Sequence, residues 1–285
     1  MKIAARLLYL FTSLLALCSC SSVDILNFTI PRSGYSVHKD ISYGADPRQK
    51  LDIYVPDQPD ASKSVIVFFY GGSWRMGSKD DYKFVAQAFA SQGFTTVIAD
   101  YRLYPQVYFP DFLKDGADAF VWVHKHIAEY GGNPENLFLA GHSAGGYNAI
   151  MLTINDAYIK AAGGNRSWIK GAIGIAGAYD FLPIIDPKIK AVFSKAEEAK
   201  TQPINFVGPN LPPMLLLQGE ADTEVDPNNT INLAAKLRRF NDPVTERLYP
   251  DVGHIGIVLA LAKGFRGKAP VLADITAFIH ANTSP

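Results

Sequence analysis

The feature that most constrains the fold is a glycine–serine–glycine turn between a predicted strand and a predicted helix. The pentapeptide Gly-His-Ser-Ala-Gly occupies residues 141–145, after an apolar strand at 137–141 and before an apolar helix at 147–154. A serine hydroxyl is a weak nucleophile at neutral pH, so an enzyme must present and activate it. A sharp strand-to-helix turn would present Ser143, because only glycine fits two residues before and after it. The helix N-terminus would then direct the Ala144 N–H toward developing negative charge.

Strands and helices alternate along the rest of the chain, and several strands are continuous apolar runs. Such runs are typical of strands buried on both faces of a parallel sheet. The alternation predicts an α/β domain with a mostly parallel central sheet flanked by helices, and with binding sites at the carboxyl ends of its strands. Two opening strands, joined by a loop longer than that of a tight hairpin, indicate an antiparallel hairpin at one edge. The predicted strands are 39–43, 51–55, 65–70, 94–99, 137–140, 169–176, 214–217 and 245–249, and the helices are 82–91, 111–130, 147–154, 230–240 and 271–280.

A nucleophilic serine needs a histidine base. His254 follows a predicted strand near the C-terminus, which fits the chain order of serine, acid and histidine that accompanies such turns. His142 adjoins the serine, and we expect it to face the scaffold of the turn. The alternative for His254 is a loop histidine without a catalytic role.

The acid that orients the base should lie between Ser143 and His254 in the chain. Asp222 directly follows the predicted strand at 214–217 and its short extension, and we select it as the acid. Each nearby carboxylate is also consistent with an ordinary solvated loop residue. The competing carboxylates are Glu220, Glu224, Asp226 and Asp251.

A second loop supplies candidate donors for an oxyanion. The sequence Tyr-Gly-Gly-Ser-Trp occupies residues 70–74, directly after a predicted buried strand. Paired glycines let backbone N–H groups approach a substrate oxygen without side-chain obstruction. We therefore expect Gly72 and Ser73 to form an oxyanion hole together with Ala144. A tight turn without function is the alternative.

Taken together, these segments resemble the α/β-hydrolases. The similarity is to the carboxylesterase and lipase branch with His-Gly-Gly-Gly-Trp oxyanion loops, which includes hormone-sensitive-lipase-like and feruloyl-esterase-like members. It implies Ser143 as nucleophile, Asp222 as acid and His254 as base, acting on esters through an acyl-enzyme without a metal or cofactor. Tyr70 replaces the histidine of the motif. The resemblance covers residues 38–282 and rests on residues 70–74, 100–105, 141–146, 219–222 and 253–254.

The same fold serves several reactions, so two other functions stay open. One is an arylformamidase-like amidase, and the other is a surface lipoprotein that keeps the fold only for binding. Residues 178–210 lose clear periodicity and could form a small cap. Aromatic side chains near the site could form an apolar substrate pocket. They are Trp74, Tyr104, Tyr108, Phe109, Tyr179 and Phe181.

The N-terminus has the pattern of an export signal. Two basic residues precede an apolar run at 7–17, which is too short to span a bilayer. The segment that follows resembles a bacterial lipobox with Cys20 as the lipid-accepting residue, although modification of Cys18 or an ordinary cleaved signal is also possible. We expect a signal peptide at 1–19, a tether at 20–37 and the hydrolase domain at 38–285. The expected location is the bacterial cell envelope, with a lipid anchor in the outer membrane or at the periplasmic face.

Charge and cysteine content exclude other classes. The chain has 27 basic and 27 acidic residues and no basic block, so nucleic acid is not an implied partner. Both cysteines lie in the first twenty residues, so the fold must depend on its core rather than on disulfides. The sequence leaves the physiological ester and the oligomeric state open.

Overall fold

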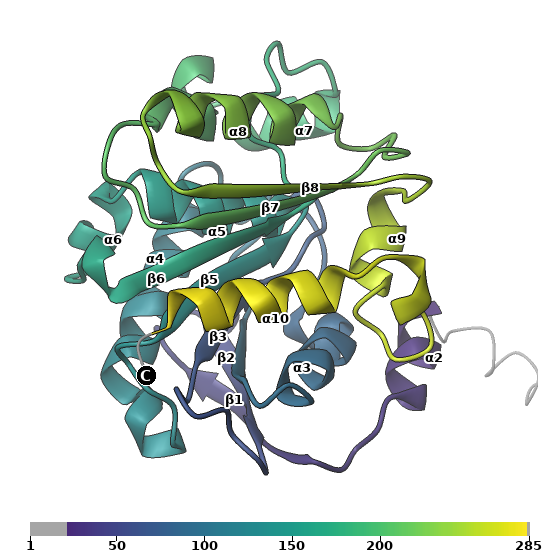
Figure 1. The fold of residues 1–285 in the computed structure, drawn as a ribbon. Coiled ribbons are helices and arrows are strands. Elements are labelled where there is room, and N and C mark those ends of the chain that lie inside the picture. The colour runs from purple at the N-terminus through teal and green to yellow at the C-terminus, as the bar shows by residue number, and fades with distance from the viewer. Residues whose placement is uncertain (1–21, 284–285) are drawn as a thin grey trace, which may run out of the picture.

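An eight-stranded sheet forms the centre of the computed structural model, which describes residues 22–283 (Figure 1). The strand order is β1-β2-β4-β3-β5-β6-β7-β8. Strand β2 pairs antiparallel with both neighbours, and all pairs from β4 to β8 are parallel. The strands are β1 (Tyr35–Ser42), β2 (Lys50–Pro56), β3 (Val65–Phe69), β4 (Thr95–Ala99), β5 (Leu137–His142), β6 (Ile169–Ile175), β7 (Met214–Gly219) and β8 (Val244–Tyr249).

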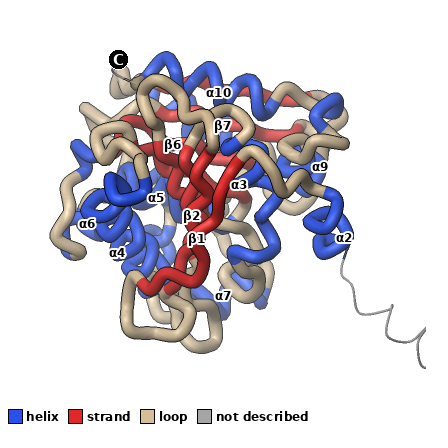
Figure 2. The backbone as a smooth tube through the Cα atoms, turned by 90° about the horizontal axis from the view of Figure 1, so that it is seen from below, coloured by secondary structure: helices blue, strands red, loops and turns tan. Residues whose placement is uncertain are grey.

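Helices cover both faces of this sheet, which explains the continuous apolar runs of its central strands. Every residue of β3, β4, β5 and β7 is buried, whereas the edge strand β1 alternates between half-buried and exposed positions. Helices α3 and α10 lie on the near face in Figure 1, and α4, α5 and α6 lie on the far face. Seen from below, the strands run between these groups (Figure 2). The helices are α2 (Ser22–Thr29), α3 (Lys83–Ala90), α4 (Asp111–His126), α5 (Ala144–Ile154), α6 (Ala157–Ala161), α7 (Pro187–Phe193), α8 (Asn228–Arg239), α9 (His254–Leu259) and α10 (Val271–Asn282).

The predicted elements are present, and the differences have local causes. Strand β1 begins at Tyr35 rather than at 39, because an edge strand with one exposed face carries polar residues that weaken the apolar pattern. The backbone of Asp40 has a φ of 56°, and the pairing register shifts there. Helix α5 begins at Ala144 rather than at 147, since small residues gave no apolar signal. Helix α9 was not predicted, because the glycines around it suggested a loop.

The expected tether at 20–37 is not a plain linker where the structure describes it. Residues 22–29 form α2, and Asn27 joins it to the domain. The Asn27 side chain donates to the carbonyls of Asp80 and Asp81, and it accepts from the N–H of Phe84. The expected signal, Cys18 and Cys20 lie outside the described residues. Within residues 22–283, no helix has the length and apolar character needed to span a membrane.

Candidate active site

Ser143 occupies a strained turn at the carboxyl end of β5. Its backbone has φ 55° and ψ −121°, a region that residues other than glycine rarely adopt. A Cβ atom added to Gly141 would lie 2.2 Å from the carbonyl oxygen of Gly145, and one added to Gly145 would lie 2.0 Å from that of Phe69. Both positions therefore require glycine for close backbone packing, as the sequence predicted.

The turn is held in place from both sides. The Ser143 N–H donates to the Ile175 carbonyl at 2.9 Å, and the Ser143 carbonyl accepts from the Tyr147 N–H at 3.0 Å. The first bond joins the turn to the end of β6, and the second begins α5. The N-terminus of this eleven-residue helix thus lies directly after the serine. Its partial positive charge favours an anion at this point.

Asp222 and His254 form a direct pair. The Nδ1 atom of His254 lies 2.8 Å from Oδ2 of Asp222, and the two side chains are 5% and 0% exposed, in that order. Asp222 follows β7, and His254 begins α9 after β8, so two neighbouring strands deliver the pair to one sheet edge. The competing carboxylates Glu220 and Asp226 make no hydrogen bond to His254 in the described structure.

The surroundings of Asp222 favour its charged form. Burial raises its pKa, but the hydrogen bond from His254 and those from the backbone N–H groups of Val225 and Glu224 outweigh burial and hold the pKa below its usual value. Oδ1 accepts both backbone bonds at 2.9 Å, and Oδ2 also accepts from Gln218 Nε2 at 2.8 Å. A carboxylate held by four donors can fix the tautomer of the imidazole beside it.

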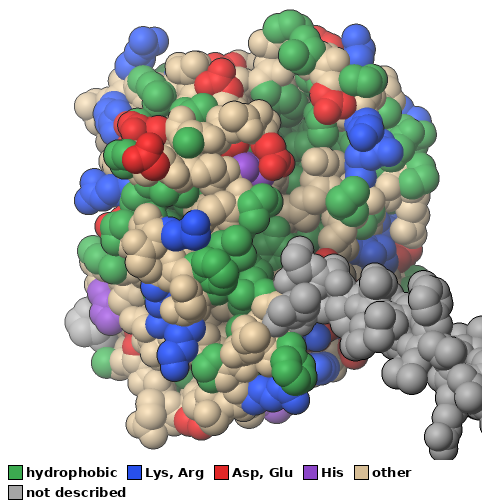
Figure 3. Space-filling view, turned by 90° about the vertical axis from the view of Figure 1, so that its right-hand side faces the viewer, with side chains coloured by type: hydrophobic (Ala, Val, Ile, Leu, Met, Phe, Trp, Pro, Cys, Tyr) green, Lys and Arg blue, Asp and Glu red, His purple; other side chains and the backbone are tan. Residues whose placement is uncertain are grey.

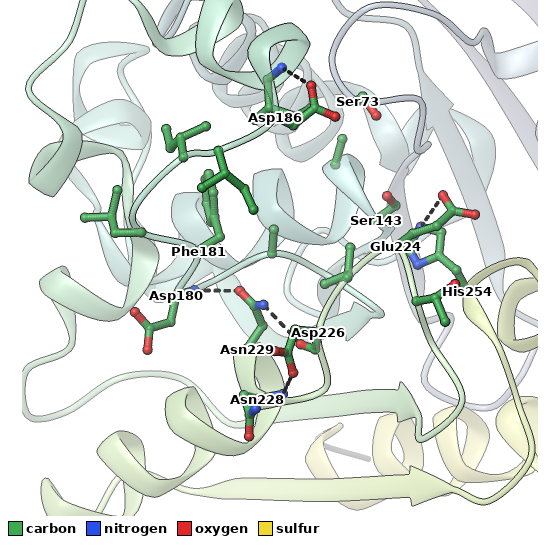
Figure 4. A pocket seen from close by; sticks show the side chains of 18 of the residues that line it. Ser73, Ser143, Asp180, Phe181, Asp186, Glu224, Asp226, Asn228, Asn229 and His254 are labelled. Atoms are coloured by element: carbon green, nitrogen blue, oxygen red, sulfur yellow. Dashed lines mark hydrogen bonds and ion pairs between the residues drawn. The ribbon is translucent and has the colours of Figure 1, made fainter.

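Ser143 and His254 line the same cavity, which has a volume of about 690 Å³ (Figure 4). Among the described residues, no hydrogen bond joins their side chains. The Nε2 atom of His254 instead lies 3.9 Å from Oε2 of Glu224, whose side chain is 61% exposed. The histidine thus has a second carboxylate near it, at Nε2 rather than at the Nδ1 atom that faces Asp222.

Apolar and acidic side chains divide the rest of the cavity. Figure 3 shows this face of the molecule, where acidic side chains lie beside a histidine and a hydrophobic recess. The segment expected as a cap, residues 178–210, supplies much of the apolar wall, and Ile189 of its helix α7 is part of that wall. Of the six aromatic residues considered for this pocket, Trp74 and Phe181 line it, whereas Tyr179 and Phe109 are buried in the core. Among residues 22–283, the lining includes four carboxylates and neither lysine nor arginine. These carboxylates are Asp180, Asp186, Glu224 and Asp226.

The loop after β3 adopts an unusual conformation. Gly72, Ser73 and Trp74 have φ values of 123°, 54° and 57°. The Gly72 carbonyl accepts from the backbone N–H groups of Arg75 and Met76 at 3.0 and 3.1 Å, which closes a tight turn. Ser73 and Ala144 line the cavity with Ser143, and Gly72 precedes them. Of the three predicted donors, Ser73 and Ala144 therefore line the cavity of Ser143, whereas Gly72 does not.

Trp74 anchors this loop to the core. Its indole Nε1 donates to Oδ1 of Asn148 on α5 at 3.0 Å, and its ring packs edge-on against Tyr147 and Phe193. The side chain is 3% exposed. The loop and the serine turn are thus attached to the same helix, which fixes their relative position.

Tyr70 supports the loop from the other end. Its ring stacks on Tyr101 at 4.7 Å, and the Tyr101 hydroxyl donates to the Tyr70 carbonyl at 2.8 Å. The Arg48 guanidinium donates to the Tyr70 hydroxyl at 2.6 Å, to the Gly77 carbonyl at 2.9 Å and to the Tyr101 carbonyl at 3.0 Å. The sequence pointed to Tyr70 but not to Arg48, because nothing local marks a hairpin arginine as a partner of a loop 22 residues away.

No group of three or more potential metal-ligating side chains occurs among residues 22–283.

Comparisons with known proteins find one matching family and relatives with esterase and formamidase names. Residues 51–237 match the protein family described as BD-FAE. A probable isoprenylcysteine alpha-carbonyl methylesterase of Arabidopsis thaliana is 30% identical over 247 residues, which are 78% of this chain and 52% of the relative. A kynurenine formamidase of Danio rerio is 28% identical over 170 residues, which are 59% of this chain and 56% of the relative. The aligned region spans about half the length of both relatives.

A solved structure shows the same fold over the whole chain. The crystal structure of an inhibited esterase B from Lactobacillus rhamnosis superposes with a TM-score of 0.78 at 18% identity, and the match covers 99% of this chain and 96% of that one. The likeness confirms the predicted fold class, an open and mostly parallel sheet flanked by helices.

Proposed function

Because this chain belongs to the BD-FAE family, we propose that it is a serine carboxylesterase that hydrolyses carboxylic esters. The observation that carries this proposal is the 2.8 Å contact between Asp222 Oδ2 and His254 Nδ1, beside a cavity that Ser143 also lines. A buried pair of this kind orients an imidazole toward a nucleophile. The esterase name of the plant relative supports the same reaction class.

The proposed reaction has two steps. His254 accepts the Ser143 proton as the hydroxyl attacks the ester carbonyl, and the alcohol then leaves with that proton. Water attacks the acyl-enzyme with the same histidine as base, which releases the acid and restores the serine. Before the first step, Nε2 of His254 must come within hydrogen-bonding reach of the Ser143 hydroxyl, since no hydrogen bond joins the two side chains in the described structure. Such adjustments are common between free enzymes and their substrate complexes.

The proposed oxyanion donors are the N–H groups of Gly72, Ser73 and Ala144. The support is that Ser73 and Ala144 line the cavity with Ser143, after a tight turn that follows β3 and at the N-terminus of α5. Donors held in this way stabilise the tetrahedral intermediate, and loss of one typically costs about 3 kcal/mol of transition-state binding.

The cavity favours compact esters. A volume of about 690 Å³ lies within the range of small-molecule sites, and the wall from the 178–210 segment is largely apolar. We propose short-chain or aromatic acyl esters as substrates, rather than long-chain triglycerides.

Covalent labelling tests the proposal directly. A fluorophosphonate probe should label Ser143, and peptide mapping by mass spectrometry should locate it there. Ser143→Ala should lose both labelling and hydrolysis of p-nitrophenyl butyrate. A wild-type protein that stays unlabelled would contradict the proposal that it is a serine carboxylesterase and would favour the non-catalytic binding function.

An amidase is the second candidate, and the similarity to a kynurenine formamidase is the observation in its favour. A series of p-nitrophenyl esters should be compared with N-formylkynurenine at equal enzyme concentration. Higher kcat/KM on the formamide would replace the esterase proposal with the formamidase.

We also propose that Cys20 carries a lipid anchor in the bacterial cell envelope. The support is the order of basic residues, apolar run and cysteine at the N-terminus. Intact-mass analysis should show a lipid adduct, and Cys20→Ala should release the protein from membranes. A mature chain without an adduct would indicate an ordinary cleaved signal.

A further inference from the structure

A buried histidine beside the serine joins the two halves of the site through hydrogen bonds that the proposed reaction does not use. The Gly71 N–H donates to the Tyr82 hydroxyl at 3.1 Å. The Tyr82 oxygen lies 3.1 Å from Nδ1 of His142, and Nε2 of His142 lies 3.1 Å from the carbonyl oxygen of His254. The chain of contacts thus runs from the loop after β3, across the serine turn, to the backbone of the proposed base.

The direction of every bond in this chain is determined. The Tyr82 oxygen accepts from Gly71, so its single proton is free to donate to Nδ1 of His142. A neutral imidazole with an acceptor at Nδ1 carries its proton at Nε2, and this proton meets the His254 carbonyl, which can only accept. The arrangement therefore requires the neutral Nε2–H tautomer of His142.

The surroundings keep both side chains in the required protonation states. Burial is the main cause that lowers the pKa of His142 to about 3, with a smaller contribution from the nearby His254. Burial likewise raises the pKa of Tyr82 to about 12. At neutral pH the tyrosine thus stays a donor and the histidine stays uncharged.

Close packing restricts the movement of the residues that form these hydrogen bonds. A Cβ atom added to Gly71 would lie 3.0 Å from the Tyr82 hydroxyl, 3.1 Å from His142 Nδ1 and 3.1 Å from the Ser143 Cβ. The rings of His142 and His254 lie 4.8 Å apart, and the His142 side chain is buried. The loop, the serine turn and the base are therefore in mutual contact at one point.

We propose that Tyr82 and His142 are positioning residues that set the distance between the oxyanion loop and the base. The proposal rests on the esterase function proposed above. Gly71 precedes the donors Gly72 and Ser73, and His254 carries the imidazole at the start of α9. A fixed connection between them keeps the oxyanion donors and the His254 imidazole at constant positions relative to Ser143. Displacement of a reacting group by about 1 Å can lower the rate about a hundredfold.

Tyr82→Phe tests this role, because it removes one hydroxyl and retains the ring. Active enzyme is counted by fluorophosphonate labelling of Ser143, so misfolded protein does not enter the result. We expect kcat per labelled site to fall by between about tenfold and about a hundredfold, with KM within about twofold. The matched control is Tyr158→Phe on α6, which should retain wild-type kcat. A Tyr82→Phe enzyme with wild-type kcat per site would overturn the proposal.

A second variant identifies the link itself. His142→Gln keeps an amide that can donate toward the His254 carbonyl but has no acceptor at the Nδ1 position. If Tyr82 acts through His142, Tyr82→Phe should lower kcat much less in the His142→Gln background than in the wild type. If Tyr82→Phe lowers kcat equally in both backgrounds, the two residues act independently, which would contradict the proposed hydrogen-bonded link through His142.

The tautomer can be tested in the wild-type protein, which removes any dependence on how the variants fold. In ¹⁵N NMR spectra, His142 should show a protonated Nε2 and an unprotonated Nδ1 throughout the pH range of activity. A protonated Nδ1 would overturn the proposed direction. If the wild type is neither labelled at Ser143 nor active on esters, the proposed function fails. The NMR result still decides the direction of the hydrogen bonds between Tyr82, His142 and the His254 carbonyl.

Discussion

The guanidinium of Arg48 lies 2.6 Å from the hydroxyl of Tyr70, and this contact joins the edge hairpin to the loop that carries the proposed oxyanion donors. Strand β2 runs antiparallel to β4, so the hairpin before β2 lies at the carboxyl ends of β4 and β3. Arg48 can therefore reach residues that follow both strands. The tyrosine that replaces the histidine of related oxyanion loops is thus held by a partner from another part of the sheet.

The first prediction concerns this contact. Arg48→Met should leave the Tyr70 hydroxyl and the carbonyls of Gly77 and Tyr101 without their donor, at a cost of about 1–3 kcal/mol for each group that water does not reach. We expect lower stability and a fall in kcat of about tenfold or more, because the loop loses its fixed position. Urea unfolding and ester kinetics measure the two effects. Arg239→Met, at an exposed position on α8, is the control and should change neither.

The second prediction concerns the orientation of the base. Asp222→Asn should keep the shape of the site but favour the wrong tautomer of His254, and kcat should fall on the order of 10⁴-fold. Glu220→Gln removes a neighbouring carboxylate that is exposed and should stay within about twofold of the wild type. Equal losses in both variants would contradict the assignment of Asp222 as the acid.

The third prediction follows from the charge of the cavity. In the part of the chain that the structure describes, its lining has four carboxylates and neither lysine nor arginine, so an anionic substrate should bind poorly. A unit charge about 4 Å away in water changes binding by about 1 kcal/mol, which is roughly fivefold in affinity. Because several carboxylates act together, we expect kcat/KM for a hemisuccinate ester to be at least about tenfold below that for the matching butyrate ester.

Salt and Glu224→Gln provide the controls for this charge effect. At 1 M ionic strength the screening length falls to about 3 Å, so the difference in kcat/KM between the hemisuccinate and butyrate esters should become smaller. Glu224→Gln should narrow it as well at low salt. If neither high salt nor Glu224→Gln changes the ratio of the two kcat/KM values, the size of the hemisuccinate group, rather than its charge, is what lowers its turnover.

The fourth prediction tests the packing of the serine turn. In Gly145→Ala the new Cβ would lie 2.0 Å from the Phe69 carbonyl oxygen, 2.4 Å from the Phe69 carbonyl carbon and 2.6 Å from the Tyr70 carbonyl oxygen. We expect a loss of at least about 3 kcal/mol in the free energy of unfolding, or failure to accumulate as soluble protein. Gly208→Ala is the control, since a Cβ there meets no atom within 4 Å. Similar stability of both variants would contradict close backbone packing as the reason that this turn requires glycine.

The sequence predicted the parts of the site that depend on local pattern. The strand–turn–helix around Ser143 and the positions of the buried strands along the chain follow from apolar periodicity and glycine spacing, so the fold class could be predicted in outline. The side-chain contacts of Arg48, Tyr82 and His142 could not, because each joins segments that only the strand order brings together. Helix α9 was missed for a different reason, since a short helix flanked by glycines gives too weak a periodic signal.

The last prediction uses the buried His142 as a probe of stability against pH. Its pKa is about 3 in the folded protein, where burial is the main cause, and about 6.5 in the unfolded chain. Between these values the unfolded state binds more protons, so the contribution of this group to stability is complete above a pH of about 6.5 and is lost as the pH falls. The loss should approach about 1.4 kcal/mol per pH unit in this window. Urea unfolding of the wild type and of His142→Gln from about pH 7 to about pH 4 measures the difference in slope, since acidic groups common to both proteins cancel. The free energy of unfolding of the variant should fall less with acid over this range. Parallel curves of this free energy against pH for the two proteins would show that His142 has the same pKa in the folded and unfolded states.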